Sequence, residues 1–341
     1  MSTTVTPQLE PDVLRSRIER FRKVQSEIVA QVRRVIVGQE EVLEQVMIGL
    51  FVGGHCLITG LPGTAKTLLV RTMAQTLGLV FKRIQFTPDL MPSDITGTDI
   101  IEEDNTTGRR TWTFVPGPIF ANVLLADEIN RTPPKTQSAL LEAMQERACT
   151  VRGHNYALPS PFFVLATQNP IELEGTYALP EAQLDRFLFN TVLDYLNADE
   201  ELKVVDLTTT TVVAQAEPIT NAQEILDFQQ LVRMVPIGES VARHAIDMVR
   251  VTRSRDETAP DFVQKYVNYG GSVRAAQFLV LSAKARALMK GRYHVTYEDI
   301  RALYIPVLRH RILLNFHAES DRLKQDDILK RVLEWKPAPR D

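Results

Sequence analysis

Residues 54–67 read Gly-His-Cys-Leu-Ile-Thr-Gly-Leu-Pro-Gly-Thr-Ala-Lys-Thr, and this stretch decides the fold. Residues 55–59 are apolar enough to form a short buried strand, and the residues after 67 have helical spacing with no breaker. A strand, a glycine-rich turn ending in Lys-Thr and a helix are typical of a loop that binds phosphate through backbone N–H groups. The positive end of the helix points at the same small volume, which suits a triphosphate. A purely structural turn is the alternative, and the complete flanks on both sides disfavour it.

The residues of this turn have distinct expected roles. Lys66 adds a positive charge for the β- and γ-phosphates, and the hydroxyl of Thr67 can hold Mg²⁺. Ala65 occupies a position where glycine is usual, so we expect its φ to be negative, with Gly60 and Gly63 in the strained backbone positions. The whole expected nucleotide-binding set in this loop is Gly60, Pro62, Gly63, Thr64, Ala65, Lys66, Thr67 and Leu68.

The composition is that of an ordinary soluble globular chain. With 341 residues, 44% of them hydrophobic and 24% charged, it predicts about two domains. A net charge of −3 does not favour nonspecific binding to nucleic acid. Cys56 and Cys149 are more consistent with packing than with a disulfide. We expect a cytoplasmic protein, because no apolar run approaches the roughly 18 residues of a membrane span and the first residues lack a signal-peptide pattern.

A second motif follows a continuous apolar run, residues 123–126, that has the pattern of a buried parallel strand. Asp127 and Glu128 come directly after this run, at the carboxyl end of the strand, where open α/β sheets bind ligands. Asp127 would hold Mg²⁺ through water, and Glu128 would polarise the attacking water. An Asp-Glu pair alone says little, but its place on a separate apolar strand after the phosphate loop makes the assignment specific.

A third polar group follows the strand predicted at residues 162–166, which ends at Thr167-Gln168-Asn169-Pro170. An amide at the tip of the strand next to the Asp-Glu strand can hydrogen-bond both the γ-phosphate and the attacking water. Taken alone, an Asn before Pro is equally consistent with a turn residue. Asn169 is therefore a candidate with an open alternative.

The segment before the phosphate loop predicts a helix and a base-binding turn. Residues 12–35 place apolar side chains on one helical face, and the basic residues elsewhere on this helix are most consistent with a solvated surface. Residues 37–39 lie just upstream of the loop, where proteins of this type often lodge the nucleotide base. Val37 and Gly38 are therefore candidate base-binding residues.

Two hairpins are predicted in the first half of the chain. Residues 98–102 and 111–115 have strand patterns and flank a hairpin-type turn at 104–108, which indicates a protruding hairpin inserted into a helical segment. A surface loop without a function is the alternative. A second, shorter hairpin is predicted to turn at Arg152-Gly153-His154.

The pattern changes after residue 197. Residues 198–220 are polar and rich in threonine and predict a linker, whereas the residues after 220 have helical patterns. Arg274 lies in the first turn of a central helix, where the helix dipole disfavours a cation, so we expect an external anion to offset that cost. A plain surface arginine is the alternative. The expected domains are 1–36 (an N-terminal helix), 37–197 (an α/β core with an insert at 87–118), 198–220 (the linker) and 221–341 (an all-α domain).

Together these stretches resemble the AAA+ ATPases, and specifically the MoxR family, from about residue 36 to 315. Besides the phosphate loop, the resemblance lies in Gln-Phe-Thr-Pro-Asp-Leu-Met-Pro-Ser-Asp (85–94), Asp-Glu-Ile-Asn-Arg (127–131), Ala-Thr-Gln-Asn-Pro (166–170) and Pro-Glu-Ala-Gln-Leu-Asp-Arg-Phe (180–187). It implies an α/β core with a five-stranded parallel sheet and helices on both faces, followed by an all-α lid. It also implies ATP and Mg²⁺ as ligands, with Ala65 as the family's own variant.

The resemblance further implies roles for residues outside the loop. Asn169 is similar to the sensor-1 residue, Arg186 to the arginine finger that reaches a neighbouring subunit, and Arg274 to the sensor-2 arginine of a hexameric ring. On position alone, Arg131 competes with Arg186. The two hairpins resemble the helix-2 insert and the pre-sensor hairpin. Family members act as chaperones that mature or activate metalloenzymes and other complexes, commonly with a partner carrying a von Willebrand factor A domain.

We therefore expect an ATPase that remodels a partner protein. A ring-forming DNA motor is the main alternative, because both hairpins also occur in replicative helicases, and the net charge and the lack of a zinc-binding or OB-type module argue against it. A GTPase-type switch is a third possibility, disfavoured because the chain has no Asn-Lys-x-Asp motif and because Glu128 favours built-in hydrolysis. The hairpin residues that could track nucleic acid are Arg109, Arg110, Trp112, Arg152 and His154.

Overall fold

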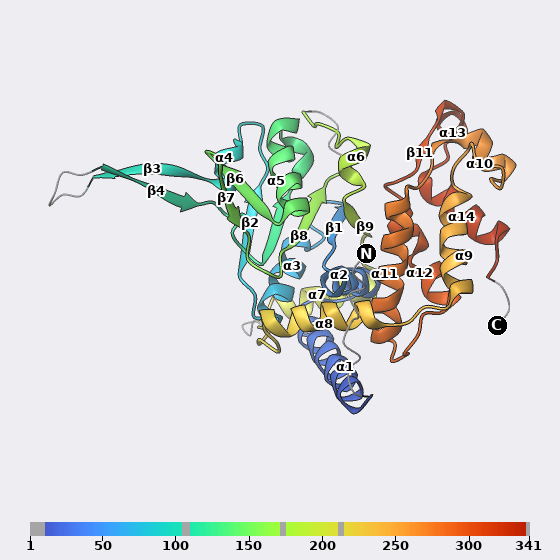
Figure 1. Cartoon of the computed structure of the whole chain (residues 1–341), viewed down its shortest axis with the longest axis horizontal. Coiled ribbons are helices and arrows are strands. Elements are labelled where there is room, and N and C mark those ends of the chain that lie inside the picture. Colours follow the sequence, from blue (N-terminus) through green and yellow to red (C-terminus); the bar gives the residue numbers. More distant parts are fainter. Residues whose placement is uncertain (1–10, 104–109, 171–174, 211–214, 339–341) are drawn as a thin grey trace, which may run out of the picture.

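The structure is a computed structural model, and it describes residues 11–103, 110–170, 175–210 and 215–338. An α/β part and a helical part lie side by side (Figure 1). A parallel sheet forms the centre of the α/β part, with its strands in the spatial order β2-β5-β8-β1-β9. The predicted five-stranded parallel sheet is therefore confirmed. The strands are β1 (His55–Gly60), β2 (Phe81–Gln85), β5 (Val123–Asp127), β8 (Phe163–Gln168) and β9 (Phe187–Leu193).

Helices cover both faces of this sheet, which explains why its inner strands are continuous apolar runs. On one face α2 (Glu40–Val52) and α3 (Lys66–Thr76) pack against the strands, and α1 (Pro11–Arg33) packs on α3 within the same apolar cluster. On the other face lie α4 (Pro92–Thr96) and α5 (Pro134–Glu146). The short helices η1 (Ile129–Arg131) and α6 (Glu181–Leu184) follow β5 and precede β9, respectively.

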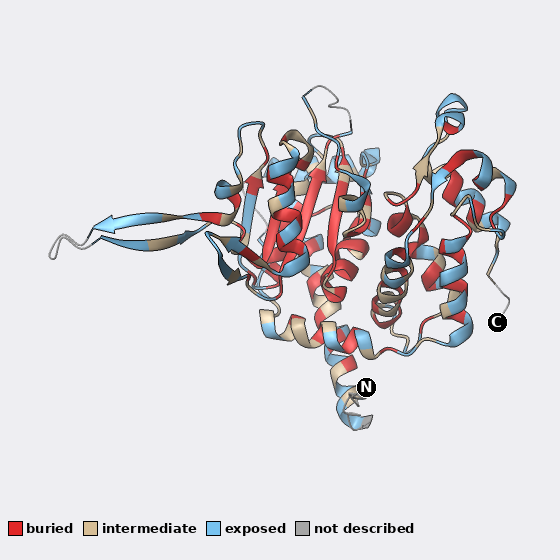
Figure 2. Cartoon of the chain, turned by 45° about the horizontal axis from the view of Figure 1, so that its top comes forward, coloured by how far each residue is buried: buried red, intermediate tan, exposed pale blue. Residues whose placement is uncertain are grey.

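Both predicted hairpins are present. The first consists of β3 (Gly97–Glu103) and β4 (Arg110–Pro116), and the second of β6 (Ala148–Val151) and β7 (His154–Ala157). The turn predicted at 104–108 lies outside the described residues. Figure 2 shows the β3–β4 hairpin extending from the molecule with largely exposed strands, whereas the central sheet is buried. The hairpins contact each other, because Phe114 stacks on Tyr156 with ring centroids 4.0 Å apart.

The helical part differs in detail from the all-α prediction. A two-stranded antiparallel sheet joins β10 (Val267–Tyr269) to β11 (Leu313–Leu314). The helical pattern after residue 220 therefore does not separate α12, which ends at Leu308, from β11, because a short apolar run does not reveal from periodicity whether it is helix or strand. The helices are α8 (Ala222–Met234), α9 (Glu239–Arg250), α10 (Asp261–Tyr266), α11 (Val273–Met289), α12 (Tyr297–Leu308), α13 (Phe316–Ser320) and α14 (Gln325–Trp335).

Within the predicted linker over 198–220, Ala198–Thr208 form the helix α7. The Asn197 side chain accepts a hydrogen bond from the Glu200 N–H at 3.0 Å, and Glu200 in turn accepts one from the Asn197 N–H. This capping box was the signal for a helix start. The segment nevertheless has the polar composition of a linker, because α7 has no buried residue and so needs no apolar face.

The helical part shares its apolar core with one face of the sheet. The rings of Phe21 on α1, Phe51 on α2 and Phe228 on α8 meet there, with Phe21 4.8 Å from Phe51 and 5.1 Å from Phe228 between centroids. The same cluster continues through α9, α11 and α12. Cys56 and Cys149 are both free and buried, as expected for packing residues. Across the described ranges, no helix combines the length and the apolar character needed to span a membrane.

The edge strand β9 is also bound by polar groups of the helical part. Arg309 donates to the carbonyl of Asn190 at 2.9 Å, and the imidazole Nε2 of His310 donates to the carbonyl of Phe187 at 3.0 Å. Arg311 donates to the carbonyl of Leu188 at 3.3 Å and pairs with the Asp185 carboxylate at 2.8 Å. Three consecutive residues after α12 therefore cover carbonyls along the free edge of the sheet.

Candidate active site

The phosphate loop lies between β1 and α3, as predicted, but its backbone differs from our expectation. Ala65, the residue before α3, has φ 59°, so the prediction of a negative φ is wrong. The left-handed region costs a residue with a Cβ roughly 1–2 kcal/mol, and alanine is the smallest such residue. Gly63 takes the other left-handed position, with φ 80°. Gly60 is required for space instead, since a Cβ there would lie 2.8 Å from the Leu193 carbonyl oxygen.

Lys66 lies over the loop that it terminates. Its ammonium group donates to the carbonyls of Gly60 at 2.9 Å and Leu61 at 2.6 Å. Partial burial lowers the pKa of Lys66 from its ordinary value, and the nearby carboxylates of Asp127 and Glu128 oppose that shift. The structure therefore brings Lys66 close to both predicted acidic residues.

Asp127 ends β5 with both carboxylate oxygens engaged. Its Oδ1 accepts a hydrogen bond from the Thr167 hydroxyl at 2.6 Å, and that hydroxyl accepts one from the Glu128 N–H at 2.9 Å. Its Oδ2 accepts from Nη2 and Nε of Arg83 on β2, at 2.6 and 3.1 Å. Asp127 is buried, so this arrangement fixes the carboxylate on the floor of the site.

Glu128 has φ 57°, an uncommon backbone conformation that turns the chain sharply after β5. Its Oε2 accepts hydrogen bonds from the Gln85 amide at 2.7 Å and from Nη1 of Arg131 at 3.1 Å. Arg131 therefore lies beside the predicted catalytic carboxylate of its own chain. The Glu128 carboxylate is partly exposed.

Asn169 follows β8 and is buried. Because β8 lies between β5 and β1, the carboxyl ends of three adjacent strands bring Asn169, the acidic pair and the phosphate loop to one edge of the sheet. The structure thus places together the residues that the sequence could only place on separate strands. Sequence reasoning missed Arg83, and it took Gln85 and Thr167 only as members of motifs.

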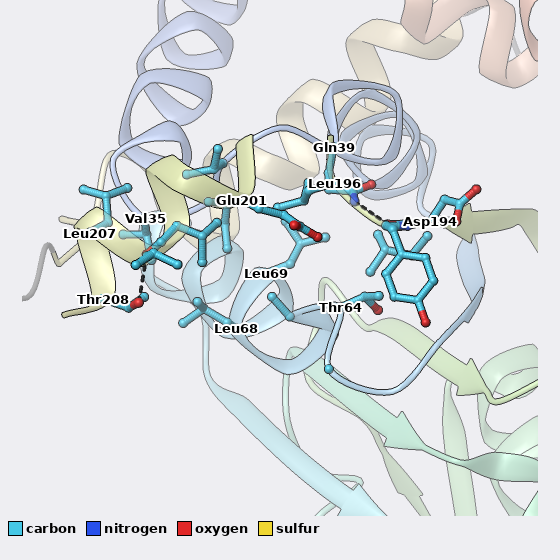
Figure 3. A pocket seen from close by; sticks show the side chains of 18 residues that line it. Val35, Gln39, Thr64, Leu68, Leu69, Asp194, Leu196, Glu201, Leu207 and Thr208 are labelled. Carbon is cyan, nitrogen blue, oxygen red and sulfur yellow. Dashed lines mark hydrogen bonds between the residues drawn. The ribbon is translucent and has the colours of Figure 1, made fainter. Parts of the chain in front are cut away.

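An apolar pocket of about 360 Å³ adjoins the phosphate loop (Figure 3). Val37, a candidate base-binding residue, lines this pocket, and Leu68 and Ala65 line it from the loop side. Gly38, with φ 66°, does not line it, and a Cβ there would lie 2.6 Å from Oε1 of Glu200. The remaining walls include Val35, Ile36, Gln39, Gly63, Thr64, Leu69 and the segment Leu193–Leu196, together with Glu201, Val204, Val205, Leu207 and Thr208 of α7.

The helix α7 forms one side of the cavity. Two lining residues of this pocket are joined by a hydrogen bond, because the Gln39 side chain donates to the carbonyl of Asp194 at 2.8 Å, a contact drawn in Figure 3. An apolar cavity beside a phosphate-binding loop fits a purine base. The hydroxyl of Thr67 and the carboxylate of Asp127 are the hard oxygen ligands that Mg²⁺ prefers. The residues present therefore fit ATP with Mg²⁺.

Arg186 and Arg274 lie away from the phosphate loop. Phe187 pairs with His55 at the start of β1, so Arg186 lies at the amino end of the sheet. The phosphate loop leaves the carboxyl end of β1 at Gly60, about 17 Å away at roughly 3.3 Å per residue. Arg186 donates to the carbonyl of Leu141 at 2.7 Å.

Arg274, for which an external anion is expected, has a carboxylate partner within the chain. Arg274 pairs with Asp185 at 3.3 Å, and the Ser272 hydroxyl also donates to Asp185. Asp185 directly precedes Arg186 in the chain. The two arginines therefore occupy one region, joined through Asp185, and neither borders the apolar pocket beside the loop.

A phosphate loop after β1 of a five-stranded parallel sheet, an asparagine after the neighbouring strand β8, an acidic pair at the end of the next strand β5, and a helical lid define an AAA ATPase. The description "ATPase family associated with various cellular activities (AAA)" matches residues 55–189, and "AAA lid domain" matches residues 261–332. A putative ATPase from Cytophaga hutchinsonii has a similar structure, with a TM-score of 0.89 and 40% identity over 96% of this chain and 99% of that one.

Two relatives that align with most of this chain identify its family within the AAA ATPases. The chain is 41% identical to Chaperone MoxR1 of Mycobacterium tuberculosis, over 91% of this chain and 81% of the relative. It is 31% identical to Protein MoxR of Paracoccus denitrificans, over 87% and 89%. The chain belongs to the MoxR family of AAA ATPases, and it is therefore an enzyme that hydrolyses ATP.

Proposed function

We propose that this ATPase assembles into a ring, with six subunits expected, and uses ATP hydrolysis to remodel or activate a partner protein complex. A relative of 41% identity is named a chaperone, which supports this direction. The extended β3–β4 hairpin supports it too, because it presents exposed side chains far from the residues of the chemical step. We infer a partner that carries a von Willebrand factor A domain. Buried free cysteines are consistent with a reducing, cytoplasmic setting.

We assign the chemical step to the edge where β5, β8 and β1 end. Lys66 binds the phosphates, Glu128 orients and deprotonates the attacking water, and Asn169 positions that water against the γ-phosphate. Thr67 and Asp127 would hold Mg²⁺, which supplies charge stabilisation for the transferred phosphoryl group. Val37 and the apolar wall of α7 exclude water around the base. The convergence of these groups on one edge of the sheet is the observation that carries this assignment.

We assign Arg186 and Arg274 to the nucleotide of a neighbouring subunit. Arg186 lies at the end of the sheet opposite the phosphate loop, at a separation of about 17 Å that no arginine side chain spans. Arg274 pairs with Asp185, the residue that precedes Arg186. An arginine that meets the γ-phosphate of the next subunit would make hydrolysis depend on assembly. Arg131, by contrast, contacts Glu128 of its own chain and is better suited to bracing that carboxylate.

A nucleic-acid motor is less well supported. The described cations of the two hairpins already have partners within the chain, since Arg110 pairs with Glu103 at 2.9 Å and Arg152 approaches Asp99 to 3.8 Å. The guanidinium of Arg152 also lies 4.3 Å from the ring centre of Trp112. Arg109 lies outside the described residues. These contacts leave little free positive charge for phosphates.

The chemical assignment is tested by comparing Lys66→Ala with Glu128→Gln. Lys66→Ala should lose ATP binding, because its charge meets the ground-state phosphates. Glu128→Gln should bind ATP normally and lose about 10²–10⁴-fold in turnover, the usual contribution of a general base. Nucleotide affinity and steady-state hydrolysis are measured for both, with the exposed Lys82→Ala as a matched lysine control. Wild-type turnover by Glu128→Gln would show that the base is another group.

The chaperone assignment is tested with a von Willebrand factor A domain protein encoded beside this chain. We expect the Glu128→Gln variant to retain that protein in the presence of ATP and to release it without nucleotide. Equal retention of the partner with and without ATP would show that partner binding does not depend on the nucleotide, and it would contradict the proposal.

A further inference from the structure

Arg83 occupies an unusual place for a cation in a site that binds a divalent metal. It lies on β2, whose register pairs Gln85 with Asp127 and Arg83 with Leu125. The alternation of side chains along strands therefore puts Arg83, Gln85 and Asp127 on the same face of the sheet. The Arg83 side chain is 46% exposed and the Asp127 side chain 11% exposed, so the pair lies at the boundary between site and solvent.

The guanidinium of Arg83 binds two groups at once. Its Nη2 donates to Oδ2 of Asp127 at 2.6 Å and to Oε1 of Gln85, also at 2.6 Å. The Gln85 amide thereby turns its oxygen toward Arg83 and its nitrogen toward Glu128, where it donates at 2.7 Å. A flipped amide would place two sets of N–H donors against each other. Arg83 thus fixes the orientation of the group that holds the Glu128 carboxylate.

A divalent cation and Arg83 compete for the same carboxylate. The other oxygen of Asp127 is already bound by the Thr167 hydroxyl, so the Oδ2 side is where both cations meet it. Mutual repulsion between a guanidinium and a divalent cation in a partly buried site weakens whichever binds second. Loss of the Arg83–Asp127 contact would also free Gln85 to rotate, which would leave Arg131 as the remaining described donor to the Glu128 carboxylate.

We propose that Arg83 is a positioning residue that joins Asp127 to Glu128 through Gln85, and that a divalent cation at Asp127 displaces it. Release of Glu128 for catalysis is then linked to occupation of Asp127. This inference rests on the proposed roles of Asp127 and Glu128. By reciprocity of linked equilibria, removing Arg83 must strengthen cation binding.

The test measures the affinity for Mn²⁺, as the probe for Mg²⁺, by electron paramagnetic resonance with a non-hydrolysable ATP analogue. Arg83→Met should bind Mn²⁺ about two- to fivefold more tightly than wild type, the range expected for loss of a half-exposed ion pair. Arg83→Lys keeps the charge and should stay near wild type. Lys82→Met removes the same charge from the same strand on the opposite face, and it should change nothing.

Coupling through Gln85 is tested by a double-mutant cycle. In a Gln85→Leu background, Arg83→Met should tighten Mn²⁺ binding by a smaller factor than in wild type, because the link to Glu128 is already lost. In turnover, Arg83→Met should lower the Mg²⁺ concentration that gives the half-maximal rate.

Three results would overturn the inference. Unchanged or weaker Mn²⁺ affinity in Arg83→Met would show that Arg83 does not compete for Asp127. A fully additive cycle would show that Arg83 acts on Asp127 alone. A kcat that falls with an unchanged Mg²⁺ requirement would make Arg83 merely structural. Failure of wild type to bind Mn²⁺ with the analogue would instead contradict the assignment of Asp127 itself.

Discussion

His55, the first residue of β1, should make the stability of the core depend on pH. Its Nδ1 accepts a hydrogen bond from the Val164 N–H at 3.0 Å, and its Nε2 donates to the Met144 carbonyl at 3.2 Å. Only the neutral ring with its proton on Nε2 satisfies both contacts. Burial of the imidazole lowers the pKa of His55 to about 4 from its ordinary value of 6.5.

Because the pKa of His55 is lower in the folded state, its contribution to stability is complete above pH 6.5 and is lost as the pH falls through 4. Between about pH 7.5 and 5.0, linkage with these two pKa values gives a loss of about 2 kcal/mol in the free energy of unfolding. His55→Gln offers an amide donor and acceptor that do not titrate. The variant should be less stable at pH 7.5, by about 1 kcal/mol, and less dependent on pH.

The assay is urea unfolding followed by circular dichroism at a series of pH values, for wild type and His55→Gln in parallel. His244 and His310 also have lowered pKa values from burial and contribute to both proteins equally. The difference between the two curves therefore isolates His55. If wild type and variant lose the same stability between pH 7.5 and 5.0, His55 does not titrate with a depressed pKa and the reasoning fails.

Three further outcomes are expected. Mixing Arg186→Ala with Lys66→Ala, each inactive alone, should restore partial ATPase activity if Arg186 serves the neighbouring subunit; no recovery, with exchange of subunits demonstrated, would rule this out. Shortening the 98–115 hairpin equally on both strands should leave basal ATPase activity near wild type and abolish its coupling to a partner, and normal pull-down of that partner would argue against a docking role. Val204→Asp places a charge in the apolar pocket and should weaken ATP binding at least tenfold without changing the melting temperature. Titration with a fluorescent ATP analogue measures this affinity, and an unaltered affinity would show that the base does not bind in this pocket.

The fold and the centre of the site were predictable because their signals are local. The strand before the phosphate loop, the apolar run before Asp127 and the strand before Asn169 each carry their pattern within a few residues. The contacts of Arg83 and Gln85 were not predictable, because they depend on β2 lying next to β5, and strand order does not follow from one sequence. The helix α7 was missed because it covers a pocket instead of entering a core.

The φ of Ala65 shows a different limit. The sequence identified Ala65 as a departure from glycine, and steric reasoning then assigned it a negative φ. In the structure the loop keeps its left-handed turn and accepts the cost of one methyl group, since the helix start and the strand fix both ends of the loop. At Ala65 the positions of the strand and the helix therefore outweigh the preference of alanine for a negative φ.

The contacts of Arg309, His310 and Arg311 with β9 have a consequence for how this protein could be divided. A fragment that ends before α8 would expose the carbonyls along β9, and it would also expose the phenylalanine cluster. An exposed edge strand of this kind can pair with strands of other molecules, so we expect the fragment to aggregate. The lid is therefore no detachable module. When lids are exchanged between relatives, soluble chimaeras are expected only if Arg309, His310 and Arg311 are combined with an edge strand whose carbonyls they can bind.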